Sequence, residues 1–245
     1  MIITQSLCVG CGRCHPYCPA GAIGYQDLKS FVDQDACYEC GTCLRVAACP
    51  VNALVEPDSV YEYPRAVRKF FSDPTSTHAV TGISGRGTEE SKTNDVTRRC
   101  REDEVGVAIE TGRPTVGMGL RDIEKITRAL AASGIHKIEP HNPIHSLIKN
   151  EVTGDLQPEL IGERVLSAII ELQIKRERLP HLLQVIKEVA NEVDSVFCLD
   201  VFMTVEAGLT IPPTVLAMID AAGLSWRPNA KINMGLGRAW EESDT

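Results

Sequence analysis

The feature that most constrains this chain is a dense group of cysteines close to its first residue. Of ten cysteines in 245 residues, eight lie between positions 8 and 49. The first run consists of Cys8, Cys11, Cys14 and Cys18, and the second of Cys37, Cys40, Cys43 and Cys49. In each run two residues separate each of the first three cysteines from the next, and a proline follows the fourth cysteine. A segment this rich in thiols is expected to fold around disulfides or around a metal that the thiols bind.

Three kinds of site use closely spaced cysteines, and the pattern separates them. Disulfide frameworks are typical of secreted domains, but the first residues lack a basic segment followed by an apolar one, so no secretory signal is expected. Structural zinc sites usually combine two pairs of cysteines. Three cysteines at two-residue spacing followed by Cys-Pro are instead typical of bacterial iron–sulfur sites. Because this pattern occurs twice, the sequence favours two [4Fe-4S] clusters as cofactors.

The spacing also predicts which cysteines share a cluster. Three thiolates two residues apart let one tight loop surround a cluster, and Gly10, Gly12 and Gly41 leave room for a close approach. In two-cluster proteins the fourth cysteine of a run binds the other cluster. We therefore expect two crossed ligand sets. The first cluster takes Cys8, Cys11, Cys14 and Cys49, and the second takes Cys37, Cys40, Cys43 and Cys18.

The two runs belong to an internal repeat of about thirty residues, in which Cys18 to Ile23 aligns with Cys49 to Leu54. On these motifs, residues 1 to about 56 resemble the bacterial two-[4Fe-4S] ferredoxin family, which implies an N-terminal ferredoxin domain. The second run departs from the family pattern, because five residues instead of three separate Cys43 from Cys49. Cys49 still fits the role of a ligand, since a proline follows it as in the first run.

A connector is expected after this ferredoxin domain, which we place at residues 1–62. Residues 64–71 have the pattern of a short helix with proline in its first turn, and we expect the helix to pack on the ferredoxin domain. Residues 72–104 are rich in Ser, Thr, Gly and charge, as in a linker. Their length also suits a loop that orders against a ligand or partner. Residues 63–104 are therefore predicted to form a connector helix and a polar loop.

Residues 105–245 are predicted to form an α+β domain. Strands are expected at residues 105–109, 135–139, 166–174 and 197–203, the third of them with one polar face. Helices are expected at residues 122–133 and 180–193, and a further helix at 213–222 and strand at 230–236 would add an αβ unit. The order βαββαβ predicts a small antiparallel sheet backed by two helices. At the level of fold this resembles the ferredoxin-like or ACT-like sandwiches.

Composition narrows the classes of partner. A net charge of -8 argues against nucleic acid, and no apolar run is long enough to span a membrane. The acidic surface could orient a basic redox protein partner. Oxygen-sensitive clusters would need the reducing conditions of an anaerobic cytoplasm, where we expect the protein to reside. The α+β domain could also form a homo-oligomer.

Two cysteines outside the runs have different expected roles. Cys100 lies between two arginines, which would lower the pKa of its thiol, so a reactive or third-site thiol is one hypothesis. Cys198 lies within an apolar strand and is expected to be buried and inert.

The histidines also fall into two groups with different expected roles. His136, His141 and His145 could bind a metal, but the prolines between them favour scattered loop histidines. His15 and Tyr17 lie between cluster ligands, where they would tune the solvation of the sulfurs and the cluster potential.

Together these patterns favour an electron-transfer protein over an enzyme that makes or breaks bonds. Each expected cluster takes all four ligands from protein, which leaves no iron open for a substrate. The chain would relay single electrons through two [4Fe-4S] clusters, as a carrier or as a subunit of a larger oxidoreductase. Two alternatives stay open, because the α+β fold does not choose a function. One is a redox enzyme with a substrate site in the C-terminal domain, and the other is a redox- or ligand-sensing regulator.

Overall fold

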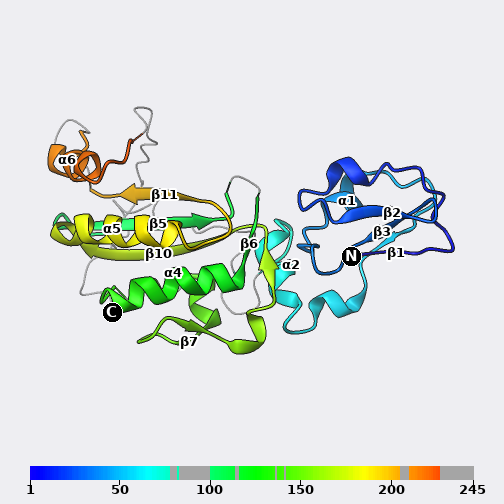
Figure 1. Cartoon of the computed structure of the whole chain (residues 1–245), viewed down its shortest axis with the longest axis horizontal. Helices are drawn as coiled ribbons and strands as arrows, with labels where there is room; N and C mark the ends of the chain where they lie inside the picture. Colours follow the sequence, from blue (N-terminus) through cyan, green and yellow to red (C-terminus); the bar gives the residue numbers. More distant parts are fainter. Residues whose placement is uncertain are drawn as a thin grey trace.

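The structure is a computed structural model of the chain and describes residues 1–77, 82, 100–113, 116–135, 137–140, 142–204 and 210–226. Two lobes are visible in Figure 1, with helix α2 (Ala66–Ser72) between them. The smaller lobe holds the N-terminus and both cysteine runs, and the larger lobe holds the two longest helices.

The smaller lobe consists of short strands and turns. Strand β1 (Ile2–Ile3) pairs antiparallel with β4 (Leu54–Val55), and β2 (Ile23–Gln26) forms a hairpin with β3 (Lys29–Val32). The pairing of β1 with β4 brings the two ends of the internal repeat together. It therefore places the last cysteine of the second run next to the first run.

The two runs contain different helices. The first run contains the 3-10 helix η1 (His15–Tyr17), and the second contains α1 (Thr42–Val46). Helix α1 takes up the longer spacing of the second run, because most of the residues between Cys43 and Cys49 form its turns. A second 3-10 helix, η2 (Asp58–Tyr61), follows β4 and leads toward α2.

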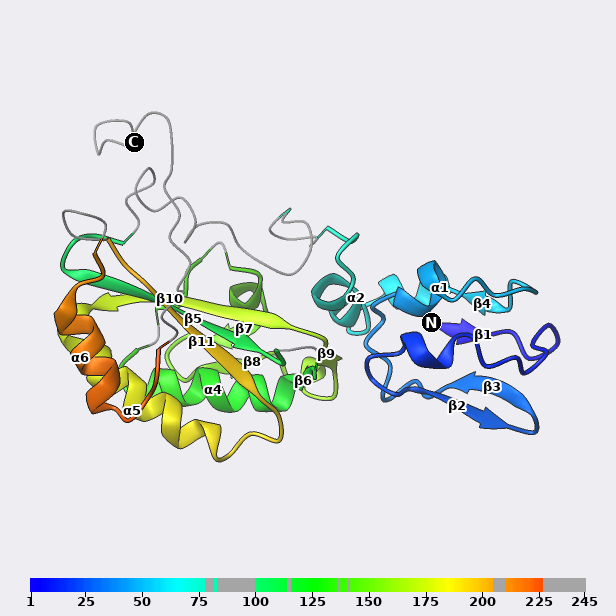
Figure 2. The same ribbon diagram turned by 90° about the horizontal axis from the view of Figure 1, so that it is seen from above.

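The larger lobe is built on a three-stranded antiparallel sheet in the order β10 (Ala168–Lys175), β5 (Glu104–Thr111), β11 (Phe197–Phe202). In this sheet Ile109 lies opposite both Ile170 and Leu199. Helices α4 (Leu120–Ala132) and α5 (Leu179–Ala190) lie side by side along the sheet (Figure 2). The alternating residues predicted to face the core are buried in β5 and β10 and half-buried in β11. Helix α6 (Pro213–Ala221) packs next to α5. The α+β class predicted for this region is thus confirmed.

One predicted strand is reduced to a single bridge. Of the described residues 135 and 137–139, none belongs to a strand, and Ile138 makes an antiparallel bridge to Leu172 of the outer strand β10. The pairing stops because Pro140 follows and has no N–H to donate. The supposed polar face of β10 is also covered, since the Glu171 side chain is buried with 3% exposure.

Several short elements were not predicted, one immediately before α4 and the others between α4 and β10. They are β6 (Met118–Gly119), η4 (Pro143–Leu147), β7 (Ile148–Asn150), β8 (Asp155–Leu156), η5 (Pro158–Leu160) and β9 (Arg164–Val165). Strand β6 pairs with β9 and β7 with β8, and a further 3-10 helix, η6 (Arg176–Arg178), precedes α5. Strands this short carry too few residues for a period to be visible in the sequence. The predicted strand at residues 230–236 and most of the polar loop at 72–104 lie outside the described residues.

Helix α2 contacts the larger lobe as well as the smaller lobe on which it was expected to pack. Its apolar residues Val67 and Phe71 belong to the core of the larger lobe. On the side of the smaller lobe, Arg68 donates to the carbonyl oxygen of Cys37 and Lys69 pairs with Glu56. Arg68 also pairs with Glu163 of the larger lobe. The helix is therefore a shared structural element, and the domain boundaries at residues 62 and 104 stay a prediction.

Candidate metal centres

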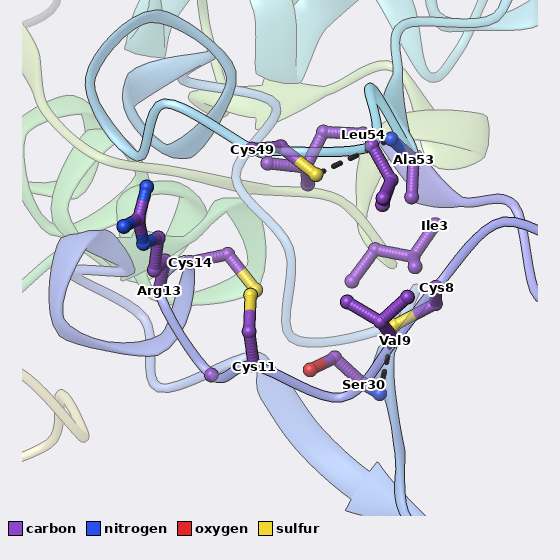
Figure 3. A pocket seen from close by; sticks show the side chains of 12 residues that line it. Ile3, Cys8, Val9, Cys11, Arg13, Cys14, Ser30, Cys49, Ala53 and Leu54 are labelled. Atoms are coloured by element: carbon purple, nitrogen blue, oxygen red, sulfur yellow. Dashed lines mark hydrogen bonds between the residues drawn. The ribbon is translucent and has the colours of Figure 1, made fainter.

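The first four predicted ligands lie around one cavity. This cavity, of about 340 Å³ with open solvent included, is lined by Cys8, Cys11, Cys14 and Cys49 (Figure 3). Three of these cysteines come from the first run and one from the second. Cys11 is exposed to solvent, and Cys8 and Cys49 are half-buried. We call these four residues the outer cysteine set.

The other four predicted ligands lie around a second cavity. This cavity, of about 330 Å³ with open solvent included, is lined by Cys18, Cys37, Cys40 and Cys43. Three of its cysteines are buried and Cys18 is half-buried. We call these four residues the inner cysteine set, because their loop lies against the larger lobe.

Contacts with the larger lobe close over the inner set. The Tyr38 side chain, 4% exposed, donates a hydrogen bond from its hydroxyl to the carbonyl oxygen of Val116 at 2.7 Å. The guanidinium carbon of Arg164 lies 5.2 Å from the centre of the same ring, a geometry in which the cation is attracted to the ring face. Gly117 leaves room for Tyr38, since a Cβ at that glycine would lie 2.2 Å from the tyrosine oxygen.

Backbone amides point at the sulfurs in both sets. In the outer set, Cys8 Sγ accepts from Gly10 N and Ser30 N, both at 3.4 Å, and Cys49 Sγ accepts from Ala53 N at 3.3 Å. The inner set has the same arrangement. Cys18 Sγ accepts from Ala22 N at 3.2 Å, and Cys37 Sγ accepts from Glu39 N at 3.4 Å. Such donors stabilise negative charge on sulfur.

The tight loops that aim these amides depend on glycine. Gly10 has a φ of +67°, and a Cβ on it would lie 2.0 Å from the carbonyl oxygen of Leu28. Gly41 also has a φ of +67° and begins α1 as its N-cap. The group that Gly10 approaches is the β2–β3 turn, so the predicted close approach of these glycines to a cluster stays a prediction.

Burial raises the pKa of thiols in both sets, and most strongly in the inner one. In the outer set it raises the pKa of the buried Cys14. In the inner set, burial raises the pKa of Cys37 to about 11 and that of Cys43 to about 12. At Cys49 of the outer set, burial is the largest single influence and acts upward. Backbone amides from Val51, Ala53 and their neighbours together outweigh it and lower the pKa. Metal binding by the inner set must therefore release protons that its thiols otherwise hold firmly.

The donor sets fit a [4Fe-4S] cluster in each cavity. Four cysteines surround each space, and amides are aimed at sulfur in both. In the part of the chain that the structure describes, no group of three or more His, Cys, Asp or Glu side chains is arranged around a single metal ion. The cysteines instead lie around a wider space in each cavity.

A layer of charged residues surrounds the inner set and was not predicted from the sequence. Arg68 and Arg45 donate to the carbonyl oxygens of Cys37 and Cys40 at 2.8 and 2.7 Å. Glu39 is fully buried and pairs with the N-terminal ammonium group and with Arg65. Arg68 is 31 positions from Cys37 and Arg65 is 26 positions from Glu39, so no local spacing could have indicated these contacts.

The expectations for the two remaining cysteines are reversed. Cys198 is exposed, because side chains alternate along β11 and Leu199 takes the core side, so the prediction of a buried thiol is wrong. Cys100 is 2% exposed, and burial raises the pKa of its thiol to about 11. The hypothesis of a reactive thiol at Cys100 is therefore not supported.

The histidines give no metal centre in the described residues. His145 lies in η4 and pairs through Nε2 with Glu151 Oε1 at 3.1 Å, whereas His136 and His141 lie outside the described residues. His15 lies beside the outer set, where its Nε2 is 3.0 Å from Ser30 Oγ and its ring stacks near Tyr25. Tyr17 lines the inner cavity. Their predicted influence on cluster potential stays a prediction.

Comparison with known proteins identifies the class to which the smaller lobe belongs. The family model for the 4Fe-4S dicluster domain matches residues 7–54. The smaller lobe, with its two cysteine-lined cavities, is thus a 4Fe-4S ferredoxin domain. Through this segment the chain belongs to the family of ferredoxin-like proteins with a 4Fe-4S dicluster domain.

The relatives match the N-terminal part of the chain. A ferredoxin-like protein in the vnf region of Azotobacter vinelandii is 36% identical over 60 residues, which are 23% of this chain and 92% of that protein. One subunit of an ion-translocating oxidoreductase complex from Methanosarcina acetivorans is 45% identical over 47 residues, or 19% of this chain and 17% of that subunit. Pyruvate synthase subunit PorD from Methanocaldococcus jannaschii is 38% identical over 56 residues, 22% of this chain and 63% of that subunit.

Two further observations concern the whole of the described chain. No solved structure gives a significant match to the chain. Among the described helices, none is both long and apolar enough to cross a lipid bilayer.

Proposed function

We propose that this protein transfers single electrons through two [4Fe-4S] clusters, one held by the outer and one by the inner cysteine set. The observation that carries the proposal is the crossed membership of the two cavities. Cys49 lies with the first run and Cys18 with the second, as expected when the fourth cysteine of each run binds the other cluster.

The residues of the chain have separate roles in this function. When bound, a [4Fe-4S] cluster supplies a centre that accepts and gives up one electron. The cysteines hold each cluster on all sides, so the chain offers electron transfer and no open coordination site. The amides of Gly10, Ser30 and Ala53 stabilise charge on the outer sulfurs. Tyr38 and the larger lobe cover the loop of the inner set, while Cys11 leaves the outer set open to a partner.

The partner is proposed to be a redox protein or the other subunits of an oxidoreductase. Two of the relatives are named as subunits, one of an ion-translocating oxidoreductase complex and one of a pyruvate synthase, which favours a dedicated partner. We also propose that the larger lobe is a ferredoxin-like or ACT-like sandwich, because the bridge at Ile138 extends the sheet beyond β10. That lobe would dock the partner or form a homo-oligomer. Oxygen-sensitive clusters would suit an anaerobic cytoplasm.

The experiment is an anaerobic reductive titration of the reconstituted chain. We expect uptake of about two electrons per chain, one for each cluster, and return of those electrons to an oxidised ferredoxin or to cytochrome c. The titration is followed by visible absorption and by electron paramagnetic resonance (EPR). A protein that holds both clusters but passes no electrons to either acceptor would contradict the proposed function.

A further inference from the structure

One buried cation from outside the cysteine runs contacts the inner loop. Arg68 of α2 is 4% exposed. Its Nη1 donates to the carbonyl oxygens of Gln34, Asp35 and Cys37 at 3.0, 2.9 and 2.8 Å. The guanidinium therefore lies against the backbone of a residue that belongs to the inner cysteine set.

The counter-charge of Arg68 binds a different atom of the side chain. Glu163, in the larger lobe, pairs with Nε, whereas Nη1 binds the carbonyl oxygens of the inner loop. Arg45 repeats this arrangement, since its Nη2 donates to the carbonyl oxygen of Cys40 at 2.7 Å and its Nη1 to Asp73 at 2.9 Å. At Cys37 and at Cys40, therefore, an arginine contacts the backbone of the ligand, and the carboxylate that pairs with this arginine does not.

The nearest acidic residue does not cancel this positive charge. Glu39 lies between the cysteines of the inner set, but the N-terminal ammonium group and Arg65 both bind its carboxylate. Its negative charge is thus met by two cations.

The outer set has no equivalent of Arg68 among the described contacts. Arg13 lines the outer cavity, but its side chain is exposed and its Nη1 donates to Ala48 O at 3.3 Å. Solvent and salt screen an exposed charge far more than a buried one. The amide hydrogen bonds to sulfur are similar in the two sets, so buried charge is what distinguishes the inner one.

This charge matters because reduction adds an electron to a centre that is already negative. Burial in a low dielectric disfavours the added charge, and a cation nearby favours it. The inner set is the more buried of the two. Its cluster is therefore the harder one to reduce, and a buried cation nearby has the larger effect on its reduction potential.

We propose that Arg68 is a positioning residue that raises the reduction potential of the inner cluster and so keeps this buried cluster reducible. The inference rests on the proposed function, because it requires a [4Fe-4S] cluster in the inner set. It deepens that function by naming a residue, outside both cysteine runs, that sets the potential of one of the two clusters.

The test is a redox titration of each cluster followed by EPR. The signals are assigned with Cys49→Ala and Cys18→Ala, which each retain one cluster. For Arg68→Met we expect the ratio of reduced to oxidised inner cluster, at a fixed potential, to fall at least about tenfold, which is about 59 mV for a one-electron couple. The outer cluster should not shift. Arg68→Lys should retain part of the wild-type potential, and the exposed control Arg13→Met should leave the inner cluster unchanged.

Glu163→Gln separates an electrostatic role from a merely structural one. This variant removes a negative charge but keeps the cation, so the inner potential should rise. If Glu163→Gln lowers the potential as Arg68→Met does, both variants act by loosening the loop, and the proposal is overturned. A shift of both clusters by the same amount in Arg68→Met, or no shift, would also overturn it. If Arg68→Met fails to assemble the inner cluster, the rise in Glu163→Gln decides the question alone.

Failure of this inference can be told from failure of the proposed function. A wild-type chain that binds no cluster in the inner set would overturn both. A chain with both clusters and electron transfer, but with unchanged potentials in the variants, would overturn the role of Arg68 alone.

Discussion

The larger lobe buries aliphatic side chains from three long strands and two helices, whereas the smaller lobe buries cysteines and a few apolar residues between strands of two to four residues. Ile109, Ile170 and Leu172 of the larger lobe are each 0% exposed, and burial of such a side chain contributes about 1.5–3 kcal/mol. The core of the smaller lobe includes Cys14, Cys37 and Cys43. Its fold therefore depends on what the thiols bind, because a small lobe with so little apolar material is marginal by itself.

The two lobes meet through polar contacts as well as apolar ones. Arg68 pairs with Glu163, Tyr38 donates to Val116, and the Ser72 hydroxyl accepts from the amide of Leu166 at 2.9 Å. A metal-dependent lobe is thus attached to one that has its own core. The predictions below test this difference.

The largest effect is expected from removal of iron. A chelator added under anaerobic conditions should unfold the smaller lobe, because the thiols then lose the ligand that joins them. Hydrogen exchange should speed up over residues 1–56 and change little in β5, β10 and α4. Equal loss of protection in both lobes would show that the larger lobe depends on the metal too.

Loss of a single ligand should affect one cluster. Cys49→Ala should lose about half of the iron and the outer cluster, and Cys18→Ala should lose the inner one, as the crossed sets require. Iron and acid-labile sulfide analysis with EPR measures both. Cys198→Ser is the control and should retain both clusters. Loss of the inner cluster in Cys49→Ala would refute the crossed assignment.

A cavity in the larger lobe should cost stability without costing iron. Ile170→Ala removes a fully buried side chain from the central layer of the core, so we expect a loss of about 2–5 kcal/mol in the free energy of unfolding of that lobe. Urea denaturation followed by circular dichroism measures the loss. Val152→Ala, at a position that is 75% exposed, should change stability by less than about 0.5 kcal/mol. A lower iron content in Ile170→Ala would show that the two lobes are strongly coupled.

The smallest effect is expected at the junction. Tyr38→Phe removes the hydrogen bond to Val116 and should reduce stability by about 0.5–1.5 kcal/mol. Because the bond joins the lobes, hydrogen exchange should speed up in the inner loop and at Val116 together. Tyr25→Phe, which removes an exposed bond to the carbonyl oxygen of Gly10 at 3.3 Å, is the matched control and should affect the outer loop alone.

The features that could be predicted are those determined by residues close to one another in the sequence. The grouping of the cysteines around two cavities follows from their spacing, and β5 and β10 follow from alternation. The burial of Cys198 was predicted wrongly although the same alternation places its neighbour Leu199 in the core. The contacts of Arg68 and Tyr38 could not be predicted, because they join residues that are 31 and 78 positions apart. Residues 135–139 had a strand-like composition, but Pro140 ends the pairing after one bridge.

The central claim is that the smaller lobe holds two [4Fe-4S] clusters in crossed cysteine sets. The most direct measurement is the iron and acid-labile sulfide content of the anaerobically reconstituted chain, together with integration of the EPR signal after full reduction. The account predicts about eight irons, about eight sulfides and about two spins per chain, with magnetic interaction between the spins. About four irons and one spin, or stoichiometric zinc in place of iron, would contradict it.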